Sequence, residues 1–424
     1  MTTAPATDDE REPCLLVAVQ LPDVSEEATL DSLEELGALA QAAGADVVGS
    51  VIQKRAAYNP STVLGKGKLD EVNSEAKSAG AGLVIFDNEL TITQQDRLAD
   101  ALDSRVIDRT ALILDIFALH AHTREGSTQV ELAQLSYMLP RIRGQGMELS
   151  RMAGGIGTRR GPGETKLEVD RRRIRSRMRK LEGELDQMEA VRMTQRKQRA
   201  RAGLPSICLV GYTNSGKSSL LNRLTSSKVL VEDQLFSTLD STTRRAELPD
   251  GQRVVVSDTV GFIRKLPHEL VAAFRSTLEV VREADLLVHV VDSTRDETLI
   301  ERVRAVEEVL TDLESSDIPR ITALNKMDSI EPPQLAYLQR SYPDAMPISA
   351  KTGEGVDALL DEAARRISSF HAFTLHVPAG RGDVLSALYR DGSVRSRELD
   401  DDHVILVVNL PPDRLSRYSR YLVS

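Results

Sequence analysis

Short apolar runs alternate with amphipathic segments over the first 110 residues of the chain. The leucines of the segment 28–43 recur at helical spacing, and a second helical stretch is expected at residues 69–79. The apolar runs have the length of strands and occupy residues 14–20, 47–52 and 83–86. Strands that alternate with helices in this way predict an α/β layer built on a parallel sheet.

The pattern becomes helical from residue 111. A first helix is expected to end near Pro140, and a second fills residues 164–201, where apolar residues from Leu167 to Met188 follow a heptad repeat. The segment 144–163 between them contains seven glycines and three arginines and cannot form a core. Together these segments predict a projecting helical hairpin with a glycine- and arginine-rich tip.

A third pattern begins where residues 203–205, Gly-Leu-Pro, end the long helix. Strands and helices alternate again from there to about residue 370, and a small α+β segment follows. We therefore expect a multidomain α/β protein. Its expected domains are residues 1–110, 111–203, 204–370 and 371–424.

The charge of the chain is strongly uneven. The formal net charge is −10, yet residues 141–203 hold 18 basic and 8 acidic residues, while the remainder holds 36 basic and 56 acidic residues. Seven of the ten residues 171–180 are basic, and they spread around the helix. An acidic protein with one basic segment indicates a large polyanion as its partner, and a solvated charged helix is the simpler alternative.

Composition excludes several classes of protein. Apolar residues make up 41% and charged residues 28%, as in soluble globular proteins, and no apolar run has the length of a membrane span. The N-terminus lacks the apolar segment of a secretory signal. Cys14 and Cys208 are too few for a disulfide framework, so we expect buried thiols in a reducing cytoplasm.

The strongest chemical signal is a phosphate-binding loop. The segment Gly211–Ser218, GYTNSGKS, fits the pattern G-x-x-x-x-G-K-[ST], with an apolar strand before it and a helical segment from Ser219 onward. Its backbone N–H groups and the helix N-terminus would surround the phosphates. Lys217 is expected to bridge the β- and γ-phosphates during catalysis, and Ser218 to bind Mg²⁺.

Three further motifs follow in order, each after an apolar strand. In Asp258–Gly261, DTVG, the carboxylate would hold Mg²⁺ through water, and the Gly261 N–H would sense the γ-phosphate. Asn325–Asp328, NKMD, resembles the guanine-recognition motif of GTPases, in which the carboxylate of Asp328 accepts from N1–H and the exocyclic amine, donors that adenine lacks. Ser349–Lys351, SAK, resembles the supporting loop, in which the Ala350 N–H meets the guanine O6.

The switch region between the phosphate loop and DTVG is less sharply defined. Phe236–Arg244, FSTLDSTTR, offers Thr238 as the residue that completes the Mg²⁺ shell and assists catalysis together with Gly261, with Thr242 as the alternative. The predicted nucleotide-binding residues are Gly211, Tyr212, Thr213, Asn214, Ser215, Gly216, Lys217, Ser218, Ser219, Phe236, Thr238, Asp258, Thr259, Val260, Gly261, Asn325, Lys326, Asp328, Ser349, Ala350 and Lys351.

Two positions bear on the rate of hydrolysis. Phe262 stands where many small GTPases carry a water-orienting glutamine, so we expect slow intrinsic hydrolysis unless backbone groups or a partner position the water. Asn214 resembles the asparagine that holds K⁺ in some potassium-activated GTPases, where the ion neutralises developing charge. The alternative is that Asn214 bonds only within its own loop.

Taken together, these residues resemble the HflX family of translation-associated GTPases, sister to the Obg group, over nearly the whole chain. The specific part lies upstream of the GTPase motifs, in residues 112–141 and 154–175. The switch sequence resembles the family's FATLDPTTR, with Ser237 for alanine and Ser241 for proline, and the missing proline would loosen the loop after Thr238.

The resemblance implies a Ras-like P-loop GTPase domain at residues 204–370 that binds GTP, GDP and Mg²⁺. It further implies binding to the large ribosomal subunit and splitting of stalled or hibernating 70S ribosomes, with the tip of the hairpin near the peptidyl-transferase region. The basic residues of 141–203 agree with this independently, because rRNA would be met mainly through phosphate and shape. We expect a cytoplasmic monomer without a membrane anchor, with at most peripheral association with membranes.

Other functions remain open at this stage. The same basic hairpin would suit a GTP-regulated factor in ribosome assembly or RNA processing, which would sit on immature particles. A signalling GTPase with a protein effector is a third hypothesis, although the cationic excess counts against it. ATP-driven RNA remodelling by the N-terminal domain ranks last, because only Gly65–Lys68, GKGK, hints at nucleotide there, and a surface turn is the simpler interpretation.

Overall fold

The computed structural model divides the chain into two compact units. The first comprises residues 1–189 together with 233–239 and 265–275, and the second comprises 190–232, 240–264 and 276–424. The residues that the structure describes are 11–142, 166–201, 204–225, 236, 242–265, 275–294, 296–367, 371–400, 402–410 and 412–423. The architecture confirms a multidomain α/β protein.

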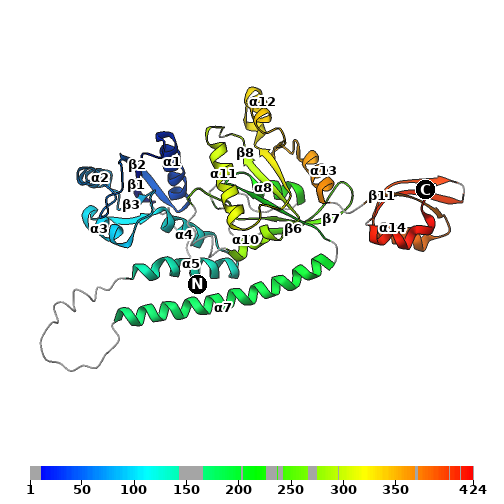
Figure 1. The fold of residues 1–424 in the computed structure, drawn as a ribbon, viewed down its shortest axis with the longest axis horizontal. Coiled ribbons are helices and arrows are strands. Elements are labelled where there is room, and N and C mark those ends of the chain that lie inside the picture. Colours follow the sequence, from blue (N-terminus) through cyan, green and yellow to red (C-terminus); the bar gives the residue numbers. More distant parts are fainter. Residues whose placement is uncertain are drawn as a thin grey trace, which may run out of the picture. The chain divides into compact units, whose positions relative to one another are not determined.

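The first unit is built on a four-stranded parallel sheet with strand order β2-β1-β3-β4 (Figure 1). The central strand β1 is buried on both faces from Cys14 to Val19, as its continuous apolar run requires. Helix α1 contacts α4, and α2 contacts α3. The bounds are β1 Glu12–Gln20, α1 Glu26–Ala42, β2 Ala45–Lys54, α2 Lys66–Ala79, β3 Leu83–Phe86, α3 Ile92–Leu102, β4 Arg105–Asp108 and α4 Arg109–His120.

The GKGK fragment differs from its sequence-based interpretation. It forms the start of α2 instead of a surface turn, with Gly65 as the N-cap residue and Lys66 as the first helical residue. The Gly65 N–H donates to Gln53 Oε1 at 2.8 Å, and Lys68 pairs with Glu71 at 2.8 Å. These contacts give the fragment a structural role within the first unit.

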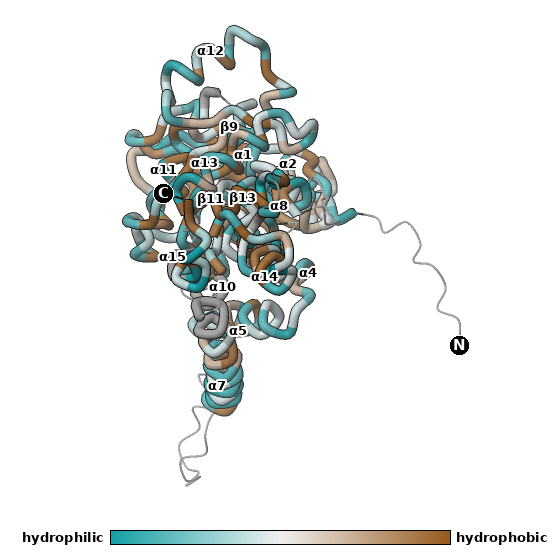
Figure 2. The backbone as a smooth tube through the Cα atoms, turned by 90° about the vertical axis from the view of Figure 1, so that its right-hand side faces the viewer, coloured by the Kyte–Doolittle hydropathy of each residue, from teal (hydrophilic) through white to brown (hydrophobic). Residues whose placement is uncertain are grey.

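Two long helices, α5 (Arg124–Arg141) and α7 (Lys166–Arg201), follow α4. Pro140 lies in the last turn of α5, close to the predicted helix end. Arg177 of α7 donates to both carboxylate oxygens of Glu131 of α5, at 2.7 and 2.6 Å. Figure 2, which views α7 end-on, shows hydrophobic positions interrupting a largely hydrophilic helix.

The heptad residues of α7 are its less exposed residues. Leu181 is 1% exposed, and the other heptad positions with described side chains, Ile174, Met178, Leu185 and Met188, are half-buried. The predicted tip at residues 144–163 lies outside the described residues. The described part of α7 therefore presents one apolar seam and a wide cationic surface.

The GTPase-like part of the second unit is a six-stranded sheet with order β10-β9-β8-β5-β7-β6, in which β6 runs antiparallel to β7 and the other pairings are parallel. A buried core of strand and helix residues, Leu209, Leu220 and Val288 among them, joins the sheet to its helices. The bounds are β5 Ser206–Gly211, α8 Lys217–Thr225, β6 Thr242–Glu247, β7 Arg253–Asp258, α10 Arg275–Arg282, β8 Leu286–Asp292, α11 Asp296–Asp312, β9 Arg320–Asn325, η1 Met327–Ser329, α12 Pro332–Ser341, β10 Met346–Pro347 and α13 Val356–Ile367.

The C-terminal segment is a three-stranded antiparallel sheet with order β11-β13-β12 and a hydrophobic core of its own. One link to the larger sheet is a hydrogen bond from Asn409 Nδ2 to Asp250 O at 2.6 Å. The bounds are β11 His371–Pro378, α14 Gly382–Asp391, β12 Ser393–Asp400, β13 His403–Leu410, α15 Pro412–Leu415 and η2 Ser416–Tyr421. Among the described helices, none is long and apolar enough to cross a membrane.

Candidate nucleotide-binding site

The phosphate loop joins the central strand β5 to helix α8. Gly211 ends β5, and Lys217 begins α8, so the backbone N–H groups at the start of α8 lie directly after the loop. Thr213 N donates to Phe262 O at 2.8 Å, and Phe262 N donates to Gly211 O at 3.1 Å. These two bonds tie the loop to the chain that follows DTVG.

Two glycines of the site have no room for a side chain. A Cβ on Gly216 would meet the Asn325 side-chain amide, and the φ of Gly216, 92°, is one that L residues rarely adopt. A Cβ on Gly261 would lie 2.7 Å from Thr213 Cα. These close neighbours explain why glycine stands at position 216 of the loop and at the end of DTVG.

Lys217 lies under the phosphate loop. Its side chain is almost fully buried, and Nζ donates to Tyr212 O at 2.8 Å and to Gly211 O at 3.2 Å. Burial lowers the pKa of Lys217 to about 8, although the nearby Asp258 carboxylate partly offsets the effect. A buried ammonium surrounded by backbone carbonyls is suited to receive the charge of a bound phosphate chain.

Asp258 and Ser218 form the candidate magnesium site. Ser218 Oγ donates to Asp258 Oδ2 at 2.5 Å, and Asp258 is fully buried at the end of β7. Burial raises the pKa of Asp258, while Lys217 and Ser218 act in the opposite direction. Asp258 Oδ1 is a buried oxygen without a hydrogen-bond partner.

Unpartnered buried oxygens also occur in the phosphate loop itself, at Thr213 Oγ1 and Ser215 Oγ. Buried polar atoms in folded proteins nearly always have partners, so three such atoms around one loop indicate a site built for a polar ligand. A carboxylate and a hydroxyl are the hard oxygen donors that Mg²⁺ prefers. The residues present therefore fit a nucleotide with its Mg²⁺.

The candidate guanine-binding side of the site is organised around Asp328, which is exposed at the surface in η1. Ser349 Oγ donates to Asp328 Oδ1 at 2.6 Å, and Ser329 Oγ donates to Oδ2 at 3.2 Å. These hydrogen bonds, that from Ser349 above all, lower the pKa of Asp328 and keep it an ionised acceptor. The carboxylate can thus accept two hydrogen bonds from a guanine edge.

The backbone N–H of Ala350 has a different partner from the one expected. It donates to Asn325 Oδ1 at 2.9 Å, whereas the sequence-based interpretation directed it at guanine O6. The same Asn325 side chain donates from Nδ2 to Ser215 O at 2.7 Å. Asn325 is 2% exposed and so joins the phosphate loop to the SAK loop inside the protein.

Two supporting residues, Arg223 and Asp292, were not singled out from the sequence. Arg223 of α8 donates to the carbonyl oxygens of Ala350 and Lys351, and Lys326 pairs with Asp292 at 2.9 Å. Phe262 is fully buried beside the phosphate loop, which explains its aromatic side chain by packing. The position of Asp292 at the end of a buried strand was the one signal that could have indicated a partner for Lys326.

The remaining predicted residues are placed as follows. Thr259 Oγ1 donates to Leu209 O at 2.8 Å, Val260 is buried, Ser219 is half-buried on α8, and Asn214 and Lys351 are exposed. Thr238 lies outside the described residues, whereas Thr242, the alternative switch threonine, starts β6 directly opposite Asp258. Phe236 belongs to the first unit, where its buried ring packs against Phe117.

A central-strand phosphate loop with its lysine, a strand-end aspartate beside the loop serine and a guanine-facing carboxylate together define a Ras-like P-loop GTPase. Four family models match the chain: "GTP-binding GTPase N-terminal" at residues 30–118, "GTP-binding GTPase Middle Region" at 120–199, "50S ribosome-binding GTPase" at 206–326 and "HflX C-terminal domain" at 336–422. The chain belongs to the GTPase HflX family.

Curated relatives support this assignment over nearly the full length. GTPase HflX of Caldanaerobacter subterraneus is 44% identical over 99% of this chain and 95% of the relative. GTPase HflX of Escherichia coli is 40% identical over 91% of both chains. A GTP-binding protein from Sulfolobus solfataricus, solved in complex with GDP, is 27% identical with a TM-score of 0.42, covering 84% of this chain and 99% of that one. The family models and the curated relatives show that the protein is a GTPase.

We expect substitution of Asp328→Asn to change base specificity. The amide keeps the shape but offers an N–H donor where guanine also presents a donor, so GTP affinity should fall about a hundredfold or more, given roughly 1.5–3 kcal/mol per hydrogen bond to a charged group. Xanthosine triphosphate carries a carbonyl at that position and should bind the variant better than the parent protein. Equilibrium fluorescence titration with both nucleotides checks this, and equal loss of both would contradict the assigned role of Asp328.

Nucleotide binding should take up protons at mildly alkaline pH. The pKa of Lys217 is lowered to about 8, and bound phosphates favour the ammonium, so the pKa rises on binding. At pH 8 the complex should take up about half a proton per nucleotide, and affinity should fall as pH rises above 8. Calorimetry of GDP binding in buffers of different ionisation enthalpy measures this uptake. No increase in uptake between pH 7 and pH 8.5 would show that Lys217 is already protonated in the free protein.

Proposed function

We propose that this GTPase binds the large ribosomal subunit through the basic helical region 141–203 and splits stalled or hibernating 70S ribosomes in a GTP-dependent manner. GTP favours the bound state, and hydrolysis allows release. The protein acts as a cytoplasmic monomer, with the amino-terminal, hairpin, GTPase and C-terminal domains divided near residues 110, 203 and 370. The observation that carries the proposal is the exposed cationic surface of α7.

That surface lies on the stretch 171–180 of α7, where seven of the ten residues are basic and none is acidic. Arg172, Arg173, Arg175, Arg179 and Lys180 are exposed on one stretch of α7. Arg177 is engaged with Glu131, and Asp170 lies 3.6 Å from Arg173. A helix that presents this many cations over two to three turns suits the phosphates of folded RNA, since rRNA is contacted largely through backbone and shape.

Hydrolysis at the site depends on positioning and charge. The N–H groups of the phosphate loop and the Lys217 ammonium would surround the phosphates, and the Gly261 N–H would meet the terminal phosphate. Ser218 and Asp258 would hold Mg²⁺, with Thr238 or Thr242 from the switch region, and the ion supplies positive charge to the β- and γ-phosphates. Phe262 is buried, so positioning of the attacking water falls to backbone groups or to the ribosome.

Removal of two exposed cations should weaken ribosome binding in a salt-dependent manner. In the double variant Arg175→Gln/Arg179→Gln, the slope of log affinity against log salt should become shallower by about one to two, since each lost phosphate contact contributes slightly less than one. Arg304→Gln/Arg340→Gln, which changes two exposed arginines of α11 and α12, is the matched control and should keep the parent slope. If both variants show the same slope, the exposed arginines of α7 do not contact the ribosome.

The splitting activity is tested by incubating 70S ribosomes with the protein and GTP, a non-hydrolysable analogue or GDP, followed by gradient sedimentation. We expect loss of 70S particles and co-migration with the large subunit when GTP or its analogue is present. Intact 70S particles together with binding to immature particles would favour an assembly factor. Intact 70S particles without bound protein would reject both and point to a protein effector.

We propose that Asn214 holds K⁺, which would add positive charge beside the phosphates during hydrolysis. Asn214 is exposed at the phosphate loop with a φ of 58°. We expect hydrolysis to be at least severalfold faster in K⁺ than in Na⁺, and Asn214→Ala to abolish the difference while GDP affinity changes little. If Asn214→Ala keeps the parent's difference in hydrolysis rate between K⁺ and Na⁺, Asn214 does not hold K⁺ and bonds only within its own loop.

A further inference from the structure

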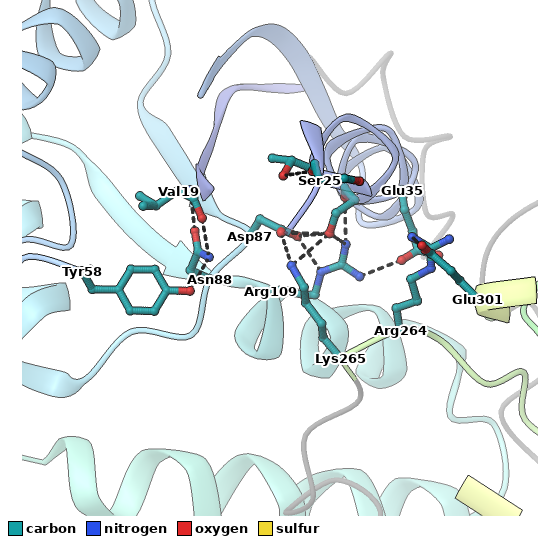
Figure 3. A network of polar contacts seen from close by, with 12 residues as sticks. Val19, Ser25, Glu35, Tyr58, Asp87, Asn88, Arg109, Arg264, Lys265 and Glu301 are labelled. Carbon is teal, nitrogen blue, oxygen red and sulfur yellow. Dashed lines mark hydrogen bonds and ion pairs between the residues drawn. The ribbon is translucent and has the colours of Figure 1, made fainter. Parts of the chain in front are cut away.

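A buried ionic cluster lies at the carboxyl end of the parallel sheet in the first unit (Figure 3). Asp87 directly follows β3, and its side chain is 2% exposed. Arg109, the first residue of α4, donates to Asp87 Oδ1 at 2.9 Å and to Glu35 Oε2 at 2.8 Å. Ser32 of α1 donates to Asp87 Oδ2 at 2.8 Å. Two helices, α1 and α4, thus hold one carboxylate in a fixed position.

The fifth member of the cluster comes from a distant part of the sequence. Lys265 Nζ lies 2.5 Å from Asp87 Oδ2 and 3.1 Å from Ser32 Oγ. Each oxygen of Asp87 therefore has its own cationic partner. Burial acts to raise the pKa of Asp87, but Arg109 and Lys265 outweigh it and hold the pKa below its usual value. A buried carboxylate is stable as an anion only with such partners.

Lys265 follows the nucleotide-sensing segment by four residues. Between Gly261 and Lys265 the chain is anchored to the phosphate loop, through the Phe262 backbone bonds and through Arg264 N, which donates to Tyr212 Oη at 2.8 Å. Four residues of chain span no more than about 14 Å. A displacement of Gly261 that accompanies gain or loss of the γ-phosphate is therefore passed to Lys265 over a short, anchored stretch.

A second switch residue makes a comparable contact within the first unit. Phe236, two residues before Thr238, is 2% exposed and packs edge-to-face on Phe117, with ring centroids 4.8 Å apart. Phe117 lies on α4, the helix that begins with Arg109. Phe236 and Lys265 both belong to the first unit, although each lies close in sequence to a nucleotide motif of the GTPase.

We propose that the amino-terminal α/β unit is the reader of the nucleotide state, with the Asp87 carboxylate as the docking site for Lys265 and the Phe117 ring as the docking site for Phe236. A change of nucleotide alters these two contacts, and by linkage their loss alters the relative affinity for the two nucleotides. Open α/β sheets usually bind small ligands at the carboxyl ends of their strands. In this unit that position is occupied by Lys265 of the same chain. The proposal rests on the GTPase activity and is independent of ribosome splitting.

The test compares Lys265→Met with Lys54→Met in the full-length protein without ribosomes. Lys265 is half-exposed, so its removal should leave the fold intact, and Lys54 provides a matched control because it pairs with Glu26 of α1 at 2.6 Å. We expect Lys265→Met to change the ratio of the affinities for GDP and a non-hydrolysable GTP analogue at least threefold. Lys54→Met should leave the ratio unchanged.

Hydrogen–deuterium exchange supplies the second readout. In the parent protein, exchange of GDP for the GTP analogue should alter protection of residues 28–36 and 83–90, and Lys265→Met should reduce that response while Lys54→Met preserves it. Phe117→Leu should shift the affinity ratio independently. Identical protection of both segments in the two nucleotide states, or an unchanged affinity ratio in Lys265→Met, would overturn the proposal, whatever the outcome of the ribosome experiments.

Discussion

The nucleotide site depends on two hydrogen bonds made by the buried side-chain amide of Asn325. It donates to a carbonyl of the phosphate loop and accepts from the backbone of the SAK loop, so two loops more than a hundred residues apart share one side chain. A buried backbone group that loses its partner costs about 1–3 kcal/mol, which strongly favours a single relative arrangement of these loops. Ser349, the neighbour of Ala350, in turn orients Asp328. The phosphate loop and the loop that orients the Asp328 carboxylate are therefore positioned by the same buried side chain.

Opposite charges are buried close together beneath the phosphate loop. Lys217 and Asp258 each experience a large cost of desolvation, and each reduces that cost for the other. The unpartnered oxygens of Thr213, Ser215 and Asp258 show that protein groups alone do not complete the arrangement. Polar groups that are already oriented can stabilise a bound polyanion without further reorganisation. Such preorganisation is the usual source of electrostatic catalysis.

The first unit combines two features that bear on regulation. It contains most of α7 with its exposed arginines, and it also holds Phe236 and Lys265 from the switch segments. Anything that binds α7 therefore binds the same unit that contacts the switches. This arrangement provides a physical route by which an RNA partner and the nucleotide could influence one another, since coupling requires only that both favour one state of a shared element.

The sequence by itself determined the alternation of strands and helices, the long heptad helix and the order of the nucleotide motifs. These features depend on local periodicity and on residues within a few positions of one another, as in Gly211–Ser218. Only the tertiary structure decided that GKGK starts a helix, that the Ala350 N–H is directed to Asn325 and that Phe262 is a packing residue. It alone joined Lys265 to Asp87, 178 residues away. Contacts of this kind depend on how distant segments fold together, and no local pattern encodes which buried carboxylate a given lysine will meet.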